Sequence, residues 1–233
     1  NKKCYENLLI IGNINYQNIK FEKKYITEEC NNNYSYQAGN RIIKVEDNYI
    51  LSIGDFDRVK NKMNGLLVQN DKNILGKLVL IDKENNPKII AKGLRNSQGL
   101  FYDKENNIIF ISDHGPYGGD EINKLFFNKD KIVNFGWPLA SYGEHYDEDD
   151  KKLLKLYPLY KSHKNFGFEE PIHFFNPSVG PSQLIRVDEQ FMNNSKNSIL
   201  LATMKDLSLH FFKFDENYNK VLKSEKIYID ERI

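Results

Sequence analysis

The sequence has few features that would cross-link the chain, insert it into a membrane or attract a charged polymer. Its 233 residues include only two cysteines, too few for a cysteine-ligated metal cluster and too far apart for a CxxC redox pair. No apolar run approaches the roughly 20 residues that a membrane-spanning helix requires. Basic and acidic side chains nearly balance, at 33 against 32, so the net charge favours neither nucleic acid nor an anionic membrane as a partner. We therefore expect a globular chain with no transmembrane segment and no nucleic-acid partner.

Common catalytic motifs are missing as well. The sequence contains no Gly-x-Ser-x-Gly elbow, no phosphate-binding loop and no dinucleotide fingerprint after a strand-like run. These absences argue against serine hydrolases, nucleotide triphosphatases and nicotinamide-dependent dehydrogenases. Paired carboxylates for glycoside hydrolysis stay open, because their separation is a three-dimensional quantity.

The two cysteines, Cys4 and Cys30, leave two alternatives open. In an oxidising compartment they could form a disulfide around a loop of about 25 residues, which would contribute roughly 3 kcal/mol through the unfolded state. They could instead be buried free thiols. The chain has no initiator Met and ends within a charged stretch, so we expect further residues at both ends.

Short runs of strand-forming residues recur along the chain, whereas long periodic helices do not. The peptide Asp-Lys-Glu-Asn-Asn occurs at 82–86 and again at 103–107, and residues 215–219 form a similar polar run. Such runs are typical of turns between antiparallel strands. An all-β chain of this kind fits a sandwich, a barrel or a propeller, and periodicity alone does not choose among them. The expected strands are 8–14, 42–45, 49–53, 77–81, 108–111, 198–204 and 209–214.

The stretch 136–181 differs from the rest because it is rich in Tyr, His, Pro and Gly and shows no clear strand pattern. We expect it to form a long loop insertion within a single β domain that covers residues 1–233. Its acidic run at 144–150 is typical of a solvated face, and it lacks the ligand spacing of an EF-hand.

Three segments carry the most chemistry, at 93–100, 112–123 and 134–138. Together they supply an arginine, two amides and several glycines near strand ends, which can surround a polar, anionic ligand with several carbonyl groups. With further blocks at 39–42, 52–55, 75–78, 177–182, 201–205 and 231–233, they resemble the soluble quinoprotein sugar dehydrogenases. This is the glucose/sorbosone dehydrogenase family, whose cofactor is pyrroloquinoline quinone (PQQ).

The resemblance implies an all-β fold, namely a six-bladed β-propeller. At about 40–50 residues per blade, 233 residues account for about four blades. A propeller left open would expose unpaired strand edges. We therefore expect the intact protein to be longer than this chain.

The resemblance also assigns residues to the cofactor. Arg95, Asn96 and Gln98 match positions that hold the quinone, and Arg95 is placed to stabilise charge that develops on it. Lys205 and Arg232 match residues that bind the cofactor carboxylates from the opposite side. His114 lies next to the expected calcium turn and is a further cofactor-binding candidate, which could also substitute for a missing base.

Two calcium sites are implied in the same way. Gly115 and Pro116 match a turn whose carbonyl oxygens hold a calcium ion that is shared with the cofactor as a Lewis acid. Glu121 and the carbonyl of Phe135 match a second, structural calcium site, with Asp120 in the same shell.

The catalytic base is where this sequence departs from the family. The family reaction removes a proton from the anomeric hydroxyl while a hydride moves to the quinone, and a histidine suits that task. Asp55 matches the aspartate that orients this histidine. Tyr36 or Gln37, depending on a one-residue gap, replaces the histidine itself. Glutamine is not a useful proton acceptor, and tyrosine with a pKa near 10 would need a large shift.

The resemblance therefore implies a PQQ- and calcium-dependent aldose dehydrogenase that oxidises a sugar at C1, with slow turnover because the histidine is absent. It further implies export to a periplasmic or extracellular space and an electron acceptor that the sequence does not identify. The alternative is a non-catalytic propeller that binds a carbohydrate or a protein partner at the same end of the fold. Fold alone does not decide between them.

Overall fold

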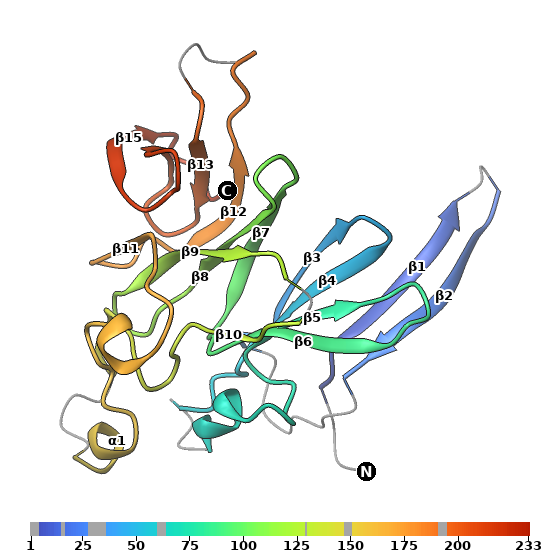
Figure 1. The fold of residues 1–233 in the computed structure, drawn as a ribbon, viewed down its shortest axis with the longest axis horizontal. Coiled ribbons are helices and arrows are strands. Elements are labelled where there is room, and N and C mark those ends of the chain that lie inside the picture. Colours follow the sequence, from blue (N-terminus) through green and yellow to red (C-terminus); the bar gives the residue numbers. More distant parts are fainter. Residues whose placement is uncertain are drawn as a thin grey trace.

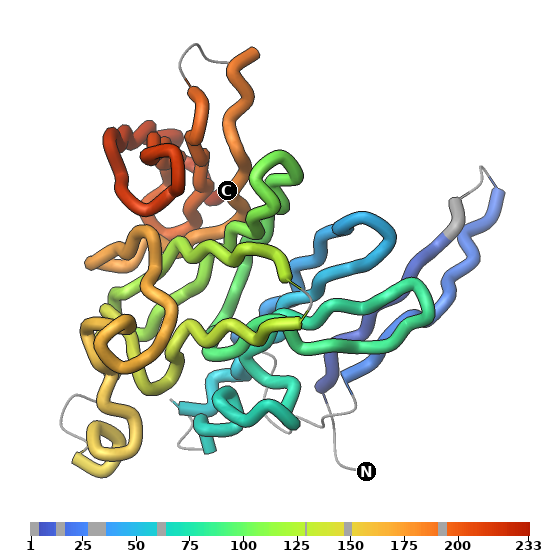
Figure 2. The backbone as a smooth tube through the Cα atoms, in the orientation of Figure 1, coloured from blue at the N-terminus to red at the C-terminus, as the bar shows by residue number. Residues whose placement is uncertain are grey.

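The computed structural model of the chain describes residues 5–14, 17–27, 36–59, 64–128, 130–146, 151–190 and 195–233. Cys4 and Cys30 lie outside these residues, so the disulfide stays a prediction. Strands are the main regular structure of the described chain, and they are grouped into four sheets that follow one another along the sequence (Figures 1 and 2). Among the described residues, none of the helices has the length and apolar character needed to span a bilayer.

Each larger sheet is an antiparallel meander in which consecutive strands are neighbours. The first sheet is the hairpin of β1 (Leu8–Ile14) and β2 (Ile19–Ile26). The second contains β3 (Gly39–Val45), β4 (Asn48–Ile53), β5 (Lys77–Ile81) and β6 (Pro87–Lys92), with β10 (Val133–Asn134) added in parallel to β6.

The third sheet contains β7 (Ser97–Asp103), β8 (Ile108–Asp113), β9 (Asp120–Phe126) and β11 (His173–Phe175). The fourth contains β12 (Pro181–Arg186), β13 (Ser198–Thr203), β14 (Ser208–Phe214) and β15 (Val221–Tyr228). All seven strands expected from sequence are present, and the three polar runs connect β5 to β6, β7 to β8 and β14 to β15, as predicted.

The first strands of the three larger sheets lie next to each other, because β7 contacts both β3 and β12. Such an arrangement is typical of propeller blades, whose first strands surround a common axis. In a meander the first strand starts, and the second strand ends, at the same end of the sheet. The loops before β3, β7 and β12 and those after β4, β8 and β13 therefore gather at one end of the axis.

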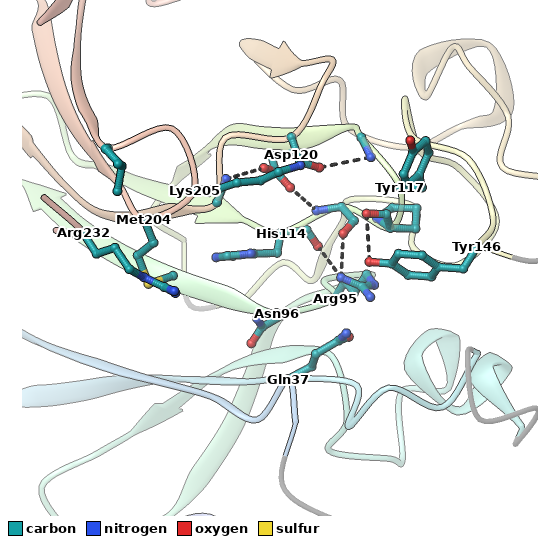
Figure 3. A pocket seen from close by; sticks show the side chains of 16 residues that line it. Gln37, Arg95, Asn96, His114, Tyr117, Asp120, Tyr146, Met204, Lys205 and Arg232 are labelled. Carbon is teal, nitrogen blue, oxygen red and sulfur yellow. Dashed lines mark hydrogen bonds between the residues drawn. The ribbon is translucent and has the colours of Figure 1, made fainter. Parts of the chain in front are cut away.

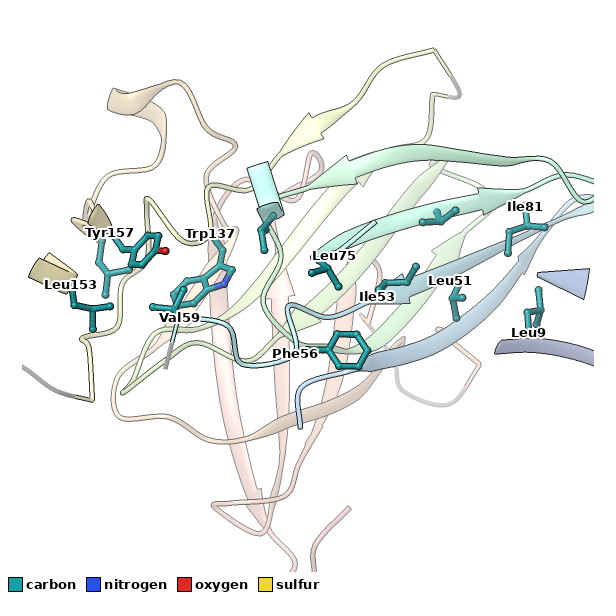
Figure 4. Close-up of a cluster of buried hydrophobic side chains, with 13 residues drawn as sticks. Leu9, Leu51, Ile53, Phe56, Val59, Leu75, Ile81, Trp137, Leu153 and Tyr157 are labelled. Carbon is teal, nitrogen blue, oxygen red and sulfur yellow. The ribbon is translucent and has the colours of Figure 1, made fainter. Parts of the chain in front are cut away.

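The core consists of three apolar clusters, each between successive sheets. Strand β4 contributes to two of them, because Leu51 and Ile53 face the first cluster while Ile50 faces the second. The first cluster continues through Trp137 to Leu153 (Figure 4). Burial on both faces explains why these strands appear in the sequence as continuous apolar runs.

The stretch 136–181 is mainly loop, with short regular elements inside it. It contains α1 (Lys151–Leu156) and the 3-10 turn η2 (Lys164–Phe166), and strand β11 completes the third sheet by pairing with β9. A second 3-10 turn, η1 (Gly65–Gln69), lies between β4 and β5. The stretch approaches the turn between β8 and β9, where the Tyr117 and Glu144 backbones exchange hydrogen bonds of 2.9 and 2.8 Å.

Candidate functional site

A cavity of about 690 Å³ opens at the end of the axis where the loops gather (Figure 3). Its walls include five of the residues that sequence analysis assigned to the cofactor, namely Arg95, Asn96, His114, Lys205 and Arg232. They also include Gln37 and three expected metal-site residues, Gly115, Pro116 and Asp120. Residues far apart in the sequence thus line a single cavity.

Arg95 is held rigidly at the inner side of this cavity. Its Nη1 donates to the carbonyl oxygens of Gly115 and His114, at 2.6 and 3.3 Å, and its Nη2 lies 3.5 Å from an oxygen of Asp57. The guanidinium carbon also lies 5.4 Å from the centre of the Trp137 ring. Contacts on several sides fix a nearly buried positive charge beside the cavity.

Asp113 shapes the turn that carries Arg95, although sequence analysis gave it no role. One carboxylate oxygen accepts the Arg95 N–H at 2.9 Å, and the other accepts the Asn96 N–H at 2.8 Å and the Ser97 hydroxyl at 2.9 Å. Burial raises the pKa of the Asp113 carboxyl. The feature that could have indicated this role is the position of Asp113 at the end of β8, where it pairs with Ser97 of β7.

Asn96 and Gln98 have different positions. Asn96 lines the cavity, and its side-chain oxygen accepts hydrogen bonds from the Gly39 N–H at 3.2 Å and from the Gln98 amide at 3.3 Å. Gln98 stands behind Asn96 and is not part of the cavity wall. Because the Asn96 oxygen has two donors, its amide N–H₂ is the group left to meet a ligand.

Asp120 connects two loops of the site. Its Oδ1 accepts the Gly115 N–H at 2.9 Å, and its Oδ2 accepts the N–H groups of Val179 and Gly180 at 2.8 and 2.9 Å. The turn it holds is tight, since a Cβ on Gly115 would lie 2.3 Å from the Gly119 carbonyl oxygen. The structure gives Asp120 a positioning role, and its predicted share in a calcium shell stays a prediction.

The turn at Gly115 and Pro116 presents main-chain oxygens of the kind that calcium prefers. The Gly115 oxygen accepts from Arg95, and the Pro116 oxygen accepts from the Tyr146 hydroxyl at 3.1 Å. A carbonyl oxygen has a second lone pair, so each can still accept another partner. Among the described residues no three His, Cys, Asp or Glu side chains are grouped to hold a metal, so a calcium ion here would depend on carbonyls and on the cofactor.

Glu121 and Phe135, expected at a second calcium site, do not line the cavity. Both are buried, and Glu121 lies in a separate cluster with Asn123 and His163. Burial raises the pKa of Glu121 well above its usual value.

Lys205 and Arg232 stand on the side of the cavity away from Arg95 (Figure 3). Lys205 follows β13, and its backbone N–H donates to the Val179 carbonyl at 2.9 Å. Both side chains are exposed, so their charges reach the open part of the cavity.

Tyr36 and Gln37, the two alternatives for the base position, are placed differently. Tyr36 is 72% exposed, whereas Gln37 lines the cavity. The Gln37 carbonyl accepts the Phe56 N–H at 3.2 Å, which anchors the backbone in a left-handed conformation with φ of 59°. Its side-chain oxygen is buried and has no hydrogen-bond partner in the described structure. Gln37 is therefore the residue of the two that can meet a ligand.

Asp55 lies behind the cavity wall and is almost fully buried. Its carboxylate accepts hydrogen bonds from the Trp137 indole at 2.8 Å and from the Asp57 N–H at 2.7 Å. Burial raises the pKa of Asp55 to about 6, against the opposing effect of the Arg95 charge. Trp137 is thus a partner of Asp55 that sequence analysis did not anticipate.

The raised pKa of Asp55 predicts a loss of stability with rising pH. The folded protein holds this proton more tightly than the unfolded chain, so the stabilisation is complete below about pH 4 and is lost as pH rises through 6. The rise of this pKa from 3.8 to about 6 corresponds to a loss of about 3 kcal/mol in the free energy of unfolding across that pH range. Denaturant unfolding at pH 4 to 7 should show this decline in wild type but not in Asp55→Asn. If the free energy of unfolding depends on pH in the same way in both proteins, the decline is not due to Asp55.

Comparison with known proteins gives a consistent result over most of the chain. The family model described as Glucose / Sorbosone dehydrogenase matches residues 6–233. An uncharacterized protein of Synechocystis sp. is 26% identical over 214 residues, which cover 84% of this chain and 49% of that protein. The aldose sugar dehydrogenase YliI of Escherichia coli is 28% identical over 143 residues, 61% of this chain and 35% of that protein. The chain therefore spans about half the length of these relatives or less.

Solved structures share the fold. A crystal structure of glucose dehydrogenase has a TM-score of 0.72 at 23% identity and covers 89% of this chain and 59% of its own. The PQQ-bound form of aldose sugar dehydrogenase from Streptomyces coelicolor has a TM-score of 0.55 at 18% identity, over 80% of this chain and 48% of its own. These likenesses confirm the expected fold, part of a β-propeller. The match of the family model over residues 6–233 shows that the chain belongs to the glucose/sorbosone dehydrogenase family.

Proposed function

We propose that the protein is a PQQ-dependent aldose sugar dehydrogenase that oxidises a sugar at C1 and turns over slowly. The observation that carries this proposal is the set of three cations, Arg95, Lys205 and Arg232, around one cavity of about 690 Å³. PQQ is a flat anion with several carboxylates, and cations on opposite walls match it. The volume lies within the range of roughly 300–1,000 Å³ that is usual for small-molecule sites.

The residues present fit both the cofactor and its calcium ion. When bound, PQQ would supply a quinone that accepts a hydride, polarised by calcium acting as a Lewis acid. Arg95 would donate to the quinone oxygen and stabilise negative charge there, and the Asn96 amide would hold the same edge. Lys205 and Arg232 would bind carboxylates on the far side. Calcium would be held by the carbonyl oxygens of Gly115 and Pro116.

Gln37 explains why we expect slow turnover. Its amide oxygen can accept a hydrogen bond from a sugar hydroxyl but does not take the proton at neutral pH. Loss of a positioned general base typically lowers the rate by about 100- to 10,000-fold. The proposal includes a periplasmic or extracellular location and a separate electron acceptor.

A non-catalytic sugar-binding propeller is the second candidate. It is favoured by Gln37, which places an amide in the cavity wall where oxidation would need a base, and whose side-chain oxygen has no hydrogen-bond partner among the described residues. Tyr117 and Tyr146 line the same cavity and are 63% and 48% exposed, so they offer aromatic surface to a ligand.

The test is a calorimetric titration of the intact protein with PQQ in calcium buffer, followed by dye reduction with a panel of aldoses. We expect saturable PQQ binding that Arg95→Lys weakens at least tenfold, because lysine keeps the charge but loses the planar fork. The matched control is Lys88→Met, which removes an exposed cation paired with Asp130 and should leave binding unchanged. Absence of PQQ binding would remove the enzyme proposal, and sugar binding without PQQ would support the second candidate.

A further inference from the structure

The loop 204–207, between β13 and β14, carries the Lys205 cation of the cavity. Met204, Lys205 and Leu207 line the cavity, whereas Asp206 does not. The Asp206 side chain is 19% exposed and contacts β14 and β15 of the fourth sheet. One residue of this loop is therefore turned away from the space that its neighbours surround.

Three side chains from successive strands hold the Asp206 carboxylate. Its Oδ2 lies 2.8 Å from Nε2 of His210 on β14 and 2.9 Å from Nζ of Lys226 on β15. The Thr203 hydroxyl, at the end of β13, donates to Oδ1. Burial opposes ionisation, but these hydrogen bonds lower the pKa of Asp206 below its ordinary value, so the group is an anion at neutral pH. The carboxylate thus connects β13, β14 and β15 at the cavity end of the sheet.

The loop backbone has a conformation that needs support from such contacts. Leu207 has a φ of 53°, in the left-handed region that leucine rarely adopts. Backbone hydrogen bonds anchor both ends of the loop, since the Lys205 N–H donates to the Val179 carbonyl and the Leu207 carbonyl accepts the Ile229 N–H, each at 2.9 Å. Asp206 lies between these anchors. Unfavourable backbone conformations persist where surrounding contacts enforce them, and they are common at ligand sites.

The same contacts keep a negative charge away from a site for anions. The Lys205 side chain is exposed, so its direction depends on the loop backbone that carries it. A carboxylate released from His210 and Lys226 could turn toward the Lys205 ammonium and neutralise it. Removal of the Asp206 carboxylate therefore has opposite effects by charge and by position. By charge alone it strengthens the binding of an anion, whereas by loss of loop position it weakens that binding.

We propose that Asp206 is a positioning residue, which holds Lys205 toward the anionic group of a ligand in the cavity through its contacts with His210 and Lys226. The inference rests on the proposed function, because it takes that anionic group to be a carboxylate of PQQ. Sequence analysis assigned Lys205 to the cofactor but gave Asp206 no role. Asp206 itself does not touch the ligand.

The test is a calorimetric titration of the intact protein with PQQ in calcium buffer. We expect Asp206→Ala to weaken PQQ binding about tenfold, although it removes a negative charge beside a site for anions. Asp206→Asn keeps one oxygen for His210 or Lys226 and should recover part of this loss. Asp215→Ala is the matched control, because Asp215 accepts backbone N–H groups at the opposite end of β14 and should bind PQQ as wild type does. Unchanged or tighter binding by Asp206→Ala would overturn the proposal.

A double-mutant cycle separates positioning of Lys205 from a general loss of structure. In the Lys205→Met background, Asp206→Ala should weaken PQQ binding by less than about twofold, because the side chain on which it acts is gone. The full effect in that background would contradict the proposal. His210→Phe keeps a ring stacked on Phe212 and removes one partner of the carboxylate, so it serves in the cycle if Asp206→Ala does not fold.

Hydrogen exchange of the protein without PQQ gives a readout that does not depend on the cofactor. We expect the backbone amides of 204–208 to exchange about tenfold faster in Asp206→Ala than in wild type or Asp215→Ala. Equal exchange would overturn the inference even if wild type binds PQQ. If wild type binds no PQQ, the proposed function is wrong, and faster exchange in Asp206→Ala would still support the role of Asp206 in holding the loop.

Discussion

Gln37→His should raise the rate of sugar oxidation by a factor of about 100 to 10,000, the usual contribution of a positioned general base. The introduced imidazole would face the cavity, as Gln37 does, and with a pKa near 6.5 it could take the proton of the C1 hydroxyl at neutral pH. Histidine also tolerates the left-handed backbone at this position better than most residues do. The measurement is initial-rate dye reduction by the PQQ-loaded protein at saturating sugar.

Tyr36→His is the matched control because it places the same group one residue earlier. Tyr36 is exposed and does not line the cavity, so its replacement should leave the rate unchanged. A higher rate in Tyr36→His instead of in Gln37→His would show that Tyr36, and not Gln37, occupies the position of the family's histidine. No gain in either variant, with PQQ bound at equal affinity, would contradict the idea that a missing base limits the rate.

The sequence predicted strands well where both faces of a strand are apolar. Strands β5 and β8 are buried along their whole length, and their uninterrupted apolar runs indicated them directly. Strand β9 was missed because its sequence, DEINKLF, looks like a polar loop. It is nevertheless almost entirely buried, because Asp120, Asn123 and Lys124 have hydrogen-bond partners from other segments or from β9 itself. Such partners depend on tertiary contacts that one sequence does not contain.

The candidate site likewise contains residues that the sequence indicated and residues that it did not. The family resemblance assigned residues such as Arg95, Asn96 and Lys205 to one ligand, and the structure places them around one cavity. It did not indicate Asp113, whose role follows from its cross-strand position opposite Ser97. Nor did it indicate Tyr146, which reaches the Pro116 carbonyl only because the stretch 136–181 folds back onto the turn. The order of the motifs along the sequence identifies residues that line the cavity. The residues that hydrogen-bond to them and fix their positions are identified by the strand register in the folded structure.

Asp120→Ala should destabilise the protein by about 3 kcal/mol, because it leaves two buried N–H groups and one partly buried N–H group without an acceptor. Asp120→Asn keeps one oxygen but turns an N–H₂ toward backbone donors, so we expect a loss of similar size. The measurement is denaturant unfolding at neutral pH. Asp188→Asn is the control, since Asp188 is exposed and its one hydrogen bond within the described residues is from the Gln190 N–H at 2.9 Å. That variant should change stability by less than about 0.5 kcal/mol.

Calcium separates the two roles that Asp120 could have. If it positions the loops through backbone hydrogen bonds, both variants lose the same stability in chelator and in calcium. If it is a calcium ligand as well, as the family resemblance implies, the loss of stability is larger in calcium than in chelator, since only in calcium is a bond to the ion also removed. The three hydrogen bonds use both carboxylate oxygens, so we expect the first result. A calcium-dependent loss would mean that Asp120 gives up a backbone donor to bind the ion.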